Sequence, residues 1–355
     1  MAAIYTVDQA LQVNDYYAAV IRAVKYENTI QAILKRGPKP EQWKQEIEVE
    51  GATPAFDLAA PEGGDFDESG LTARTNAVLE VQLEKFRSTR GYMVTDETKL
   101  LPGYTEAKGE KALARAQRKD AEEVVRSIEL ALGSTQEAVA RGTGTNVVPK
   151  TRGMMKWLDT ASHSVQPIPA AVMPTIHLES KITDPTVFTE ADFKDALTAA
   201  AVSIGDGHLS LTGLCGIKLK RAMSEWLGKA TTTTGMDTIL SRSEPKSKKI
   251  ELICDEFAYD AVTVRTLVCN SLNVTFSGSG QVVLSDTNYC AGAFIRPEFW
   301  TIDTLLALTN RTLENKGGGE RGYHEAILRL ACRNPLGQFS ITHNAEAAAT
   351  TKTGC

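Results

Sequence analysis

Three glycines, Gly317, Gly319 and Gly322, have the spacing of a dinucleotide-binding motif, Gly-x-Gly-x-x-Gly. This motif binds a cofactor at a strand-to-helix turn, where the helix N-terminus meets a pyrophosphate. The residues that follow, from Tyr323 to Leu330, instead alternate in polarity as a strand does. We therefore favour a hairpin turn at Gly317–Gly322, and we keep a soluble nucleotide-binding enzyme as an alternative.

Other reactive side chains lack the spacing that catalysis or metal binding requires. Ser243 and Lys246 match a Ser-x-x-Lys string, but a proline lies between them in a charged stretch. No histidine pair has the four-residue spacing of a helical metal site; the five histidines are His163, His177, His208, His324 and His343. No Gly-x-Ser-x-Gly turn and no phosphate-binding Gly-x4-Gly-Lys-Ser/Thr loop occurs. We predict no catalytic residue, no metal ligand and no cofactor, and hence a protein that is not an enzyme.

Composition excludes several other classes. The chain has 355 residues, 42% of them hydrophobic and 23% charged, which is typical of a folded protein. Its net charge of −5 disfavours a dedicated nucleic-acid binder, although it permits a protein that encloses nucleic acid. No run of eighteen apolar residues and no signal peptide is present, so no membrane contact is expected. The six cysteines form no CxxC pair, and we expect reduced thiols.

A long amphipathic helix is predicted from Thr105 to Leu132, with Gly133 ending it. Apolar residues recur every three to four positions along one face: Leu113, Ala116, Ala121, Val124, Ile128 and Ala131. The opposite face carries charged residues: Lys111, Arg115, Arg118, Lys119, Glu122, Glu123 and Arg126. At 1.5 Å per residue this helix is roughly 40 Å long, far more than the usual three turns. Such a helix is more typical of an elongated shell subunit than of an enzyme.

An extended hairpin is predicted before this helix. Residues 41–55 alternate in polarity, and a second alternating stretch begins near Thr75. An acidic, glycine-rich segment, Pro54 to Gly70, joins them. Because a lone two-stranded hairpin is marginal in water, it needs a surface to lie on. That surface is either a partner or the hairpin's own domain, and composition does not choose between them.

The remaining segments mix helices and short strands. Residues 1–36 form a helical or partly extended arm, which Pro38 and Pro40 end. Two helices are predicted, over Thr189–Ala201, with Thr189 as N-cap and Asp192 as its partner, and over Leu214–Leu227. Strands are predicted over 249–254, 262–269, 281–285 and 291–296, followed by a long hairpin of Trp300–Leu313 and Tyr323–Arg333. The tail from Ala345 is small and polar.

Four stretches together resemble the major capsid proteins of tailed phages that share the HK97 fold, in the branch with a short, unfused N-terminal arm. The stretch from Thr29 to Trp43 with the acidic segment resembles the arm and the E-loop, and Asn76–Thr98 resembles the returning E-loop strand. The segment TRGMMKWL at 151–158 resembles the one that follows the spine helix. Arg296–Asn334 resembles the terminal P-domain strands, with Glu325 to Asn334-Pro335 as their closing pattern.

The resemblance implies an α+β, HK97-like capsid fold. Its parts would be an N-terminal arm (1–36), an E-loop (37–90), a P-domain segment (91–145) with the spine helix at 105–132, an A-domain (146–295), P-domain strands (296–344) and a flexible tail (345–355). Some family members cross-link lysine to asparagine between subunits. Lys39, Lys44 and Lys85 lie near the E-loop but match no such motif, so no cross-link is predicted.

The implied function is that of a structural head protein. Copies of the chain would assemble in the host cytoplasm as homo-pentamers and homo-hexamers into an icosahedral virion shell. The shell would enclose viral double-stranded DNA without sequence-specific binding, and portal, scaffolding and decoration proteins stay open as further partners. An encapsulin-like compartment shell is the alternative within the same fold.

Overall fold

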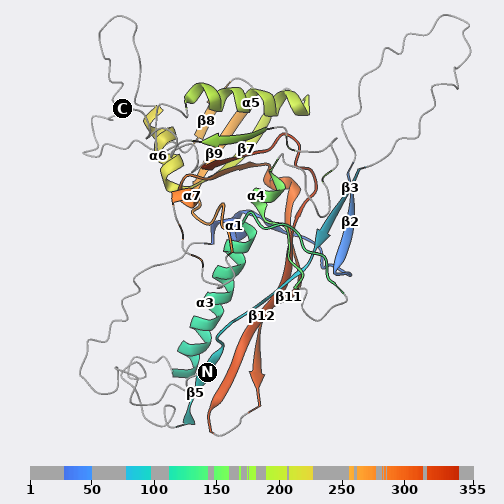
Figure 1. Ribbon diagram of the computed structural model, residues 1–355, viewed down its shortest axis with the longest axis vertical. Coiled ribbons are helices and arrows are strands. Elements are labelled where there is room, and N and C mark those ends of the chain that lie inside the picture. Colours follow the sequence, from blue (N-terminus) through green and yellow to red (C-terminus); the bar gives the residue numbers. More distant parts are fainter. Residues whose placement is uncertain are drawn as a thin grey trace, which may run out of the picture.

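The computed structural model describes residues 28–49, 77–96, 112–142, 148–159, 176–180, 189–205, 208–226, 256–259, 262–276, 286–314 and 318–343, with the single residues 168, 174, 282 and 284. Figure 1 shows how these parts are arranged. In its lower half helix α3 (Ala112–Leu132) runs beside a long hairpin of β11 (Trp300–Leu313) and β12 (Glu320–Cys332). In its upper half helix α5 (Glu190–Ile204) lies over a second sheet.

Helix α3 corresponds to the predicted long helix. It is observed from Ala112, and the predicted residues 105–111 lie outside the described part of the chain. Val124, Ile128 and Leu132 recur on its buried side and join the main hydrophobic core. Gly133 follows the helix as predicted, but it does not take the left-handed conformation of a glycine cap. Glycine is needed there because a Cβ would lie 2.2 Å from the Ser271 carbonyl oxygen.

The sheet beneath α3 is built on the long hairpin. Its strand order is β1-β11-β12-β4, and β5 also pairs with β12; the additional strands are β1 (Lys35–Arg36), β4 (Glu84–Arg87) and β5 (Tyr92–Val94). β1 is parallel to β11, and the other pairs are antiparallel. β1 pairs only with Thr301 and Ile302, and β11 extends beyond it toward the hairpin turn. The predicted terminal hairpin is therefore confirmed, with β12 beginning three residues earlier than expected.

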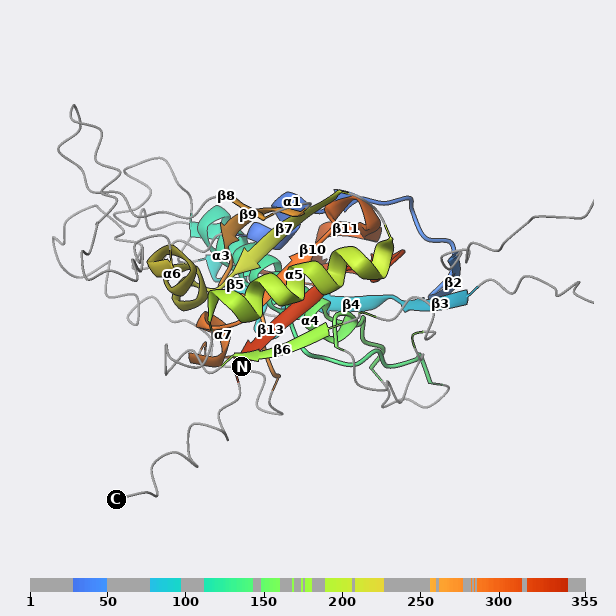
Figure 2. The ribbon, with the colours of Figure 1, turned by 90° about the horizontal axis from the view of Figure 1, so that it is seen from above.

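The second sheet has six strands in the order β6-β13-β10-β7-β9-β8. They are β6 (Ile176–Ser180), β13 (Phe339–His343), β10 (Gly292–Ile295), β7 (Leu209–Cys215), β9 (Val262–Val268) and β8 (Glu256–Tyr259). Seen from above, α5 crosses the face of this sheet (Figure 2). Phe193 of α5 packs there against Phe294 and Phe339, whose rings stack at 4.7 Å. Burial of these aromatic rings fastens the helix to the sheet.

Several predicted elements agree with the structure, and two need correction. The α5 prediction is confirmed, including the capping box of Thr189 and Asp192, although the helix continues to Ile204. The predicted helix over 214–227 starts too early, because Leu214 and Cys215 are buried in strand β7 and helix α6 is Ile217–Trp226. Strands at 262–269 and 291–296 are confirmed as β9 and β10.

The predicted strand at 281–285 is wrong for its described residues, Val282 and Leu284, which belong to no strand. Helix α7 (Asp286–Tyr289) begins two residues after Leu284, and the apolar residues before it do not mark a strand at the two described positions. The predicted strand at 249–254 lies outside the described residues. The remaining short helices are α1 (Thr29–Ile33), α4 (Met154–Trp157) and η5 (Pro297–Phe299).

Candidate assembly elements

The predicted extended hairpin is present as a separate two-stranded sheet. β2 (Lys44–Val49) pairs antiparallel with β3 (Ala77–Gln82), from Lys44↔Gln82 to Val49↔Ala77. Figure 1 shows it leaving the body at one side. Leu79 and Val81 are buried in the main core, whereas Val78 is 41% exposed. The described part of this hairpin, here called the E-loop hairpin, is thus anchored on its own subunit while it projects outward; its tip, Pro54 to Gly70, lies outside the described residues.

A buried carboxylate lies where the E-loop hairpin joins the body. Glu84 begins β4 and is 9% exposed. Its Oε2 accepts hydrogen bonds from Gln136 Nε2 at 2.8 Å and from Thr151 N at 3.0 Å. Burial raises the pKa of Glu84 to about 7, and the two hydrogen bonds only partly offset this effect. Glu84 therefore titrates near neutral pH, unlike an ordinary surface carboxylate.

A second buried charge ties the hairpin to β11 and β12. Arg329 of β12 is 1% exposed, and its Nε donates to Asp303 Oδ2 at 2.8 Å. The same guanidinium donates to the side-chain oxygen of Gln45 in β2. Because a buried charge is costly unless it is paired and hydrogen-bonded, these contacts fix the hairpin position relative to the long strands.

A third polar cluster joins α3 to the sheet below it. Asp120 is 4% exposed on the buried side of α3, four residues before Val124. Its carboxylate accepts hydrogen bonds from the Ser88 hydroxyl and, at 2.9 Å, from the backbone N–H of His324. His324 Nδ1 lies 2.7 Å from the same carboxylate. Helix α3 is thus joined both to β12 and to the turn between β4 and β5.

The root of the N-terminal arm is held by α3 as well. Glu129 is 2% exposed, and its two oxygens accept the backbone N–H groups of Ile30 at 2.7 Å and Gln31 at 3.2 Å. Burial raises the pKa of Glu129, and these hydrogen bonds oppose the rise. The arm is predicted to be helical or partly extended, and its described residues, 28–36, contain both the short helix α1 and the short strand β1.

The lysines considered for cross-linking have different surroundings. Lys44 pairs with Glu80 across the E-loop hairpin at 2.7 Å. Lys85 pairs at 2.8 Å with Glu325, which also accepts from Arg311 Nε at 2.7 Å. The Lys85 hydrogen bond is the main cause that lowers the pKa of Glu325. Lys39 is exposed. Two of the three lysines are therefore engaged within their own subunit.

Gly317 of the glycine motif lies outside the described residues, and its other two glycines, Gly319 and Gly322, lie in a hairpin and not at a helix start. Gly318 and Gly319 have left-handed φ angles of 79° and 126° in the turn between β11 and β12, and Gly322 is inside β12. A side chain at Gly319 would lie 2.6 Å from the Val94 carbonyl oxygen. The geometry for pyrophosphate binding, a helix N-terminus after the glycines, is absent from this turn.

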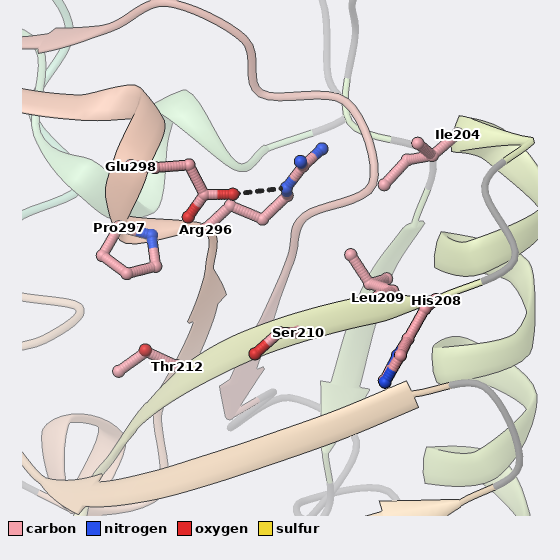
Figure 3. A pocket seen from close by; sticks show the side chains of 8 residues that line it. All are labelled: Ile204, His208, Leu209, Ser210, Thr212, Arg296, Pro297 and Glu298. Atoms are coloured by element: carbon pink, nitrogen blue, oxygen red, sulfur yellow. Dashed lines mark hydrogen bonds and ion pairs between the residues drawn. The ribbon is translucent and has the colours of Figure 1, made fainter.

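One pocket lies between the end of α5, β7 and η5. It has a volume of about 240 Å³ and is lined by Ile204, His208, Leu209, Ser210, Thr212, Arg296, Pro297 and Glu298 (Figure 3). Arg296 and Glu298 pair with each other there at 2.9 Å. The volume falls below the range of about 300–1,000 Å³ typical of ligand sites. Among the described residues no group of three metal-binding side chains occurs, and no helix is long and apolar enough to cross a membrane.

Nearly all of the chain matches one known protein family. The family model described as SU10 major capsid protein matches residues 3–344. The chain belongs to this family. No curated protein matches the sequence. Membership of the SU10 major capsid protein family gives the chain a structural role in the virion shell of a phage, not an enzymatic one.

Solved capsid structures show the same fold at low sequence identity. The capsid chain of a native GTA particle is 9% identical, with a TM-score of 0.56 over 97% of this chain and 100% of that one. The Cyanophage A-1(L) capsid chain is 10% identical, with a TM-score of 0.57 over 95% and 98%. The mature capsid chain of bacteriophage PhiM1 is 8% identical, with a TM-score of 0.54 over 94% and 92%. The predicted HK97-like fold is therefore confirmed over nearly the whole chain.

Within this family fold, periodicity identified the long elements but not the buried polar groups that join them. Asp120 carried a signal, because it lies in phase with the apolar stripe of α3. Arg329 carried one too, because it lies among apolar neighbours in β12. Glu84 and Glu129 were not distinguishable from surface carboxylates, since their partners come from distant segments.

Proposed function

We propose that this major capsid protein assembles as pentamers and hexamers into an icosahedral shell that encloses double-stranded DNA without sequence-specific contacts. The observation that carries the proposal is the family match over residues 3–344. It is supported by an E-loop hairpin that leaves the body as its own two-stranded sheet, as a subunit that reaches a neighbour requires. The net charge of −5 suits a container whose wall does not bind the DNA tightly.

The proposed division of the chain follows the predicted boundaries. Residues 1–36 form a short, unfused arm, residues 37–90 the E-loop, residues 91–145 and 296–344 the P-domain, and residues 146–295 the A-domain, with a tail after 344. Two observations support this division. The five-stranded sheet under α3 and the six-stranded sheet under α5 are distinct, and a second core cluster lies between α5 and the six-stranded sheet. Three short strands cross the proposed boundaries, because β1 of the arm and β4 of the E-loop pair within the five-stranded sheet and β13 of the 296–344 segment pairs within the six-stranded sheet.

The E-loop hairpin is proposed to lie across the adjacent subunit. Its acidic tip would pair there with basic side chains, either Lys246, Lys248 and Lys249 or Arg115 and Arg118. Exposed ion pairs contribute less than about 1 kcal/mol each, so they would set lattice register more than affinity. Assembly is then expected to weaken only modestly at high salt, and a steep loss of shells with salt would contradict this role.

Negative-stain electron microscopy of the purified protein over a concentration series tests the proposal. Closed shells, or rings of five and six subunits, are the expected result. A monodisperse monomer or dimer, unchanged after co-expression with neighbouring genes for scaffolding or portal proteins, would refute self-assembly. Decoration proteins are left open by the same experiment, because they would bind only after a shell has formed.

A deletion tests the E-loop separately from the rest. Removing Pro61 to Gly70 is expected to reduce shell yield while the subunit stays folded. Removing the ten residues 346–355 from the tail is the matched control and is expected to leave the yield near that of the full chain. Normal shells from the first deletion would exclude the E-loop tip from the assembly contacts.

A further inference from the structure

The E-loop hairpin leaves the five-stranded sheet within three residues. β4 pairs with β12 up to Glu84↔Leu328, whereas Gln82 already pairs with Lys44 of β2. Leu83 between them is fully buried, and its N–H donates to the Trp43 carbonyl at 2.9 Å. At Leu83 the chain therefore stops pairing with β12 in the body and starts pairing with β2 in the hairpin. Leu83 thus sets the direction of the hairpin.

Thr151 takes the place that β4 vacates beside β12. The N–H of Leu330, beyond the last β4 pair, donates to Thr151 Oγ1 at 3.0 Å. Thr151 N and Gln136 Nε2 both donate to Glu84 Oε2, and Gln136 Nε2 also donates to the Thr151 carbonyl at 2.8 Å. We call Glu84, Gln136, Thr151 and Leu330 the E-loop root cluster. One carboxylate oxygen of Glu84 thus joins β4 to the segments that follow α3 and, through Thr151, to β12.

A second observation concerns Gln82, which directly precedes Leu83. Gln82 is 2% exposed, and neither its Nε2 nor its Oε1 has a hydrogen-bond partner among the residues that the structure describes. Buried amides without partners are rare, because they lose their bonds to water and gain nothing in return. Movement of the hairpin about Leu83 that exposed Gln82 would remove this penalty. The hydrogen bonds of the root cluster therefore keep Gln82 buried despite the free-energy cost of its desolvation.

We propose that Glu84 is the positioning residue of the E-loop: it holds the root cluster closed, and its ionisation opens the cluster so that the hairpin can turn about Leu83. This proposal rests on the proposed assembly function, for which the direction of the E-loop matters.

The direction in which pH shifts the opening of the root cluster follows from proton binding to Glu84. In the closed cluster burial raises the pKa of Glu84 to about 7, against an ordinary value of 4.5. The charged group that faces it is Lys150, which lowers the pKa, and its hydrogen-bond partners Gln136 and Thr151 are neutral. Because the closed cluster binds the proton more tightly than an opened, solvated one, low pH favours closing and high pH favours opening. The equilibrium constant for opening should rise about tenfold between pH 6 and pH 8.5.

Hydrogen–deuterium exchange of the full-length protein measures this opening. The amides of Thr151 and Leu330 report it directly, since both bond inside the cluster. After correction for the intrinsic pH dependence of exchange, their protection should fall about tenfold between pH 6 and pH 8.5. Helix α5 with its two caps, residues 189–205, is the internal control, and the protection of its amides should show no such fall.

Two variants complete the test. Glu84→Gln keeps an oxygen that accepts both hydrogen bonds but cannot ionise, so its protection should not depend on pH. Thr151→Val keeps the side-chain shape but removes the acceptor for Leu330, so Leu330 should exchange faster than in the wild type at pH 6. A pH-independent wild type, or a Glu84→Gln variant that follows the wild-type profile, would overturn the proposal.

Electron microscopy of the same samples separates this proposal from the assembly function. If Glu84 positions the E-loop, wild-type shell yield should change between pH 6 and pH 8.5, and the Glu84→Gln yield should not. Wild-type protein that forms no shells even after co-expression with its neighbouring genes would refute the proposed function, while the exchange data would still decide the role of Glu84. Shells of equal yield at both pH values in both proteins would refute the positioning role alone.

Discussion

Replacement of Asp120 by alanine should lower the free energy of unfolding of the subunit by about 3 kcal/mol. The carboxylate is 4% exposed and accepts the His324 backbone N–H at 2.9 Å and the Ser88 hydroxyl. Alanine leaves both donors buried without this acceptor, and each unpaired donor costs about 1–3 kcal/mol. At about 1.5 kcal/mol for each of the two donors, the expected loss is about 3 kcal/mol. Helix α3 would then separate more easily from β12.

Asp120→Asn is the matched variant that keeps the shape. Its Oδ1 can accept the His324 backbone N–H, and its amide can donate to the Ser88 oxygen, so we expect a loss of about 1 kcal/mol. Glu123→Ala removes an exposed carboxylate from the same helix and should change stability by less than about 0.5 kcal/mol. Urea unfolding of the unassembled subunit, followed by circular dichroism, measures all three. The reasoning fails if Asp120→Ala falls within the range of Glu123→Ala, or if Asp120→Asn loses as much as Asp120→Ala.

Three further changes test other joints of the fold by the same urea titration. Arg329→Ala leaves Asp303, which is 3% exposed, as an unpaired buried charge, and a loss of about 3–5 kcal/mol is expected; a loss below 1 would contradict the pairing. Thr189→Ala removes the capping box of α5 and should cost about 1 kcal/mol, whereas no change would show that the cap is dispensable. Gly153→Ala places a Cβ 2.1 Å from the Ser134 carbonyl oxygen and should cost about 1–3 kcal/mol by overpacking; wild-type stability would show that the backbone yields freely.

The elements that periodicity could predict are those whose structure is set locally. The spine helix follows from an apolar stripe with a three-to-four spacing, and its observed bounds, Ala112–Leu132, lie inside the predicted range. The terminal hairpin follows from alternation on both sides of a glycine turn. The capping box of α5 follows from Thr189 and Asp192 alone. In each of these elements the interacting residues are close in sequence, so the local sequence pattern is enough to predict the structure.

Periodicity could not predict which distant segments pair with each other. Leu214 and Cys215 read as the start of a helix because apolar residues continue into α6, yet they pair with Leu267 and Val268 in the neighbouring strand β9. Nothing within ten residues of Leu214 encodes that partner. The resemblance to phage capsid proteins predicted the fold, which residue spacing could not do, because the resemblance depends on the order of elements along the whole chain.

The buried carboxylates explain how the subunit directs the parts that leave its body. Apolar burial is non-directional, so the core alone can hold the arm and the E-loop close without fixing where they point. Glu129 accepts two successive backbone N–H groups at the root of the arm, and Glu84 joins the root of the E-loop to Thr151. Hydrogen bonds weaken steeply away from linear geometry, so these contacts define directions. Both carboxylates have raised pKa values because they are buried, and the directions they set should therefore respond to pH.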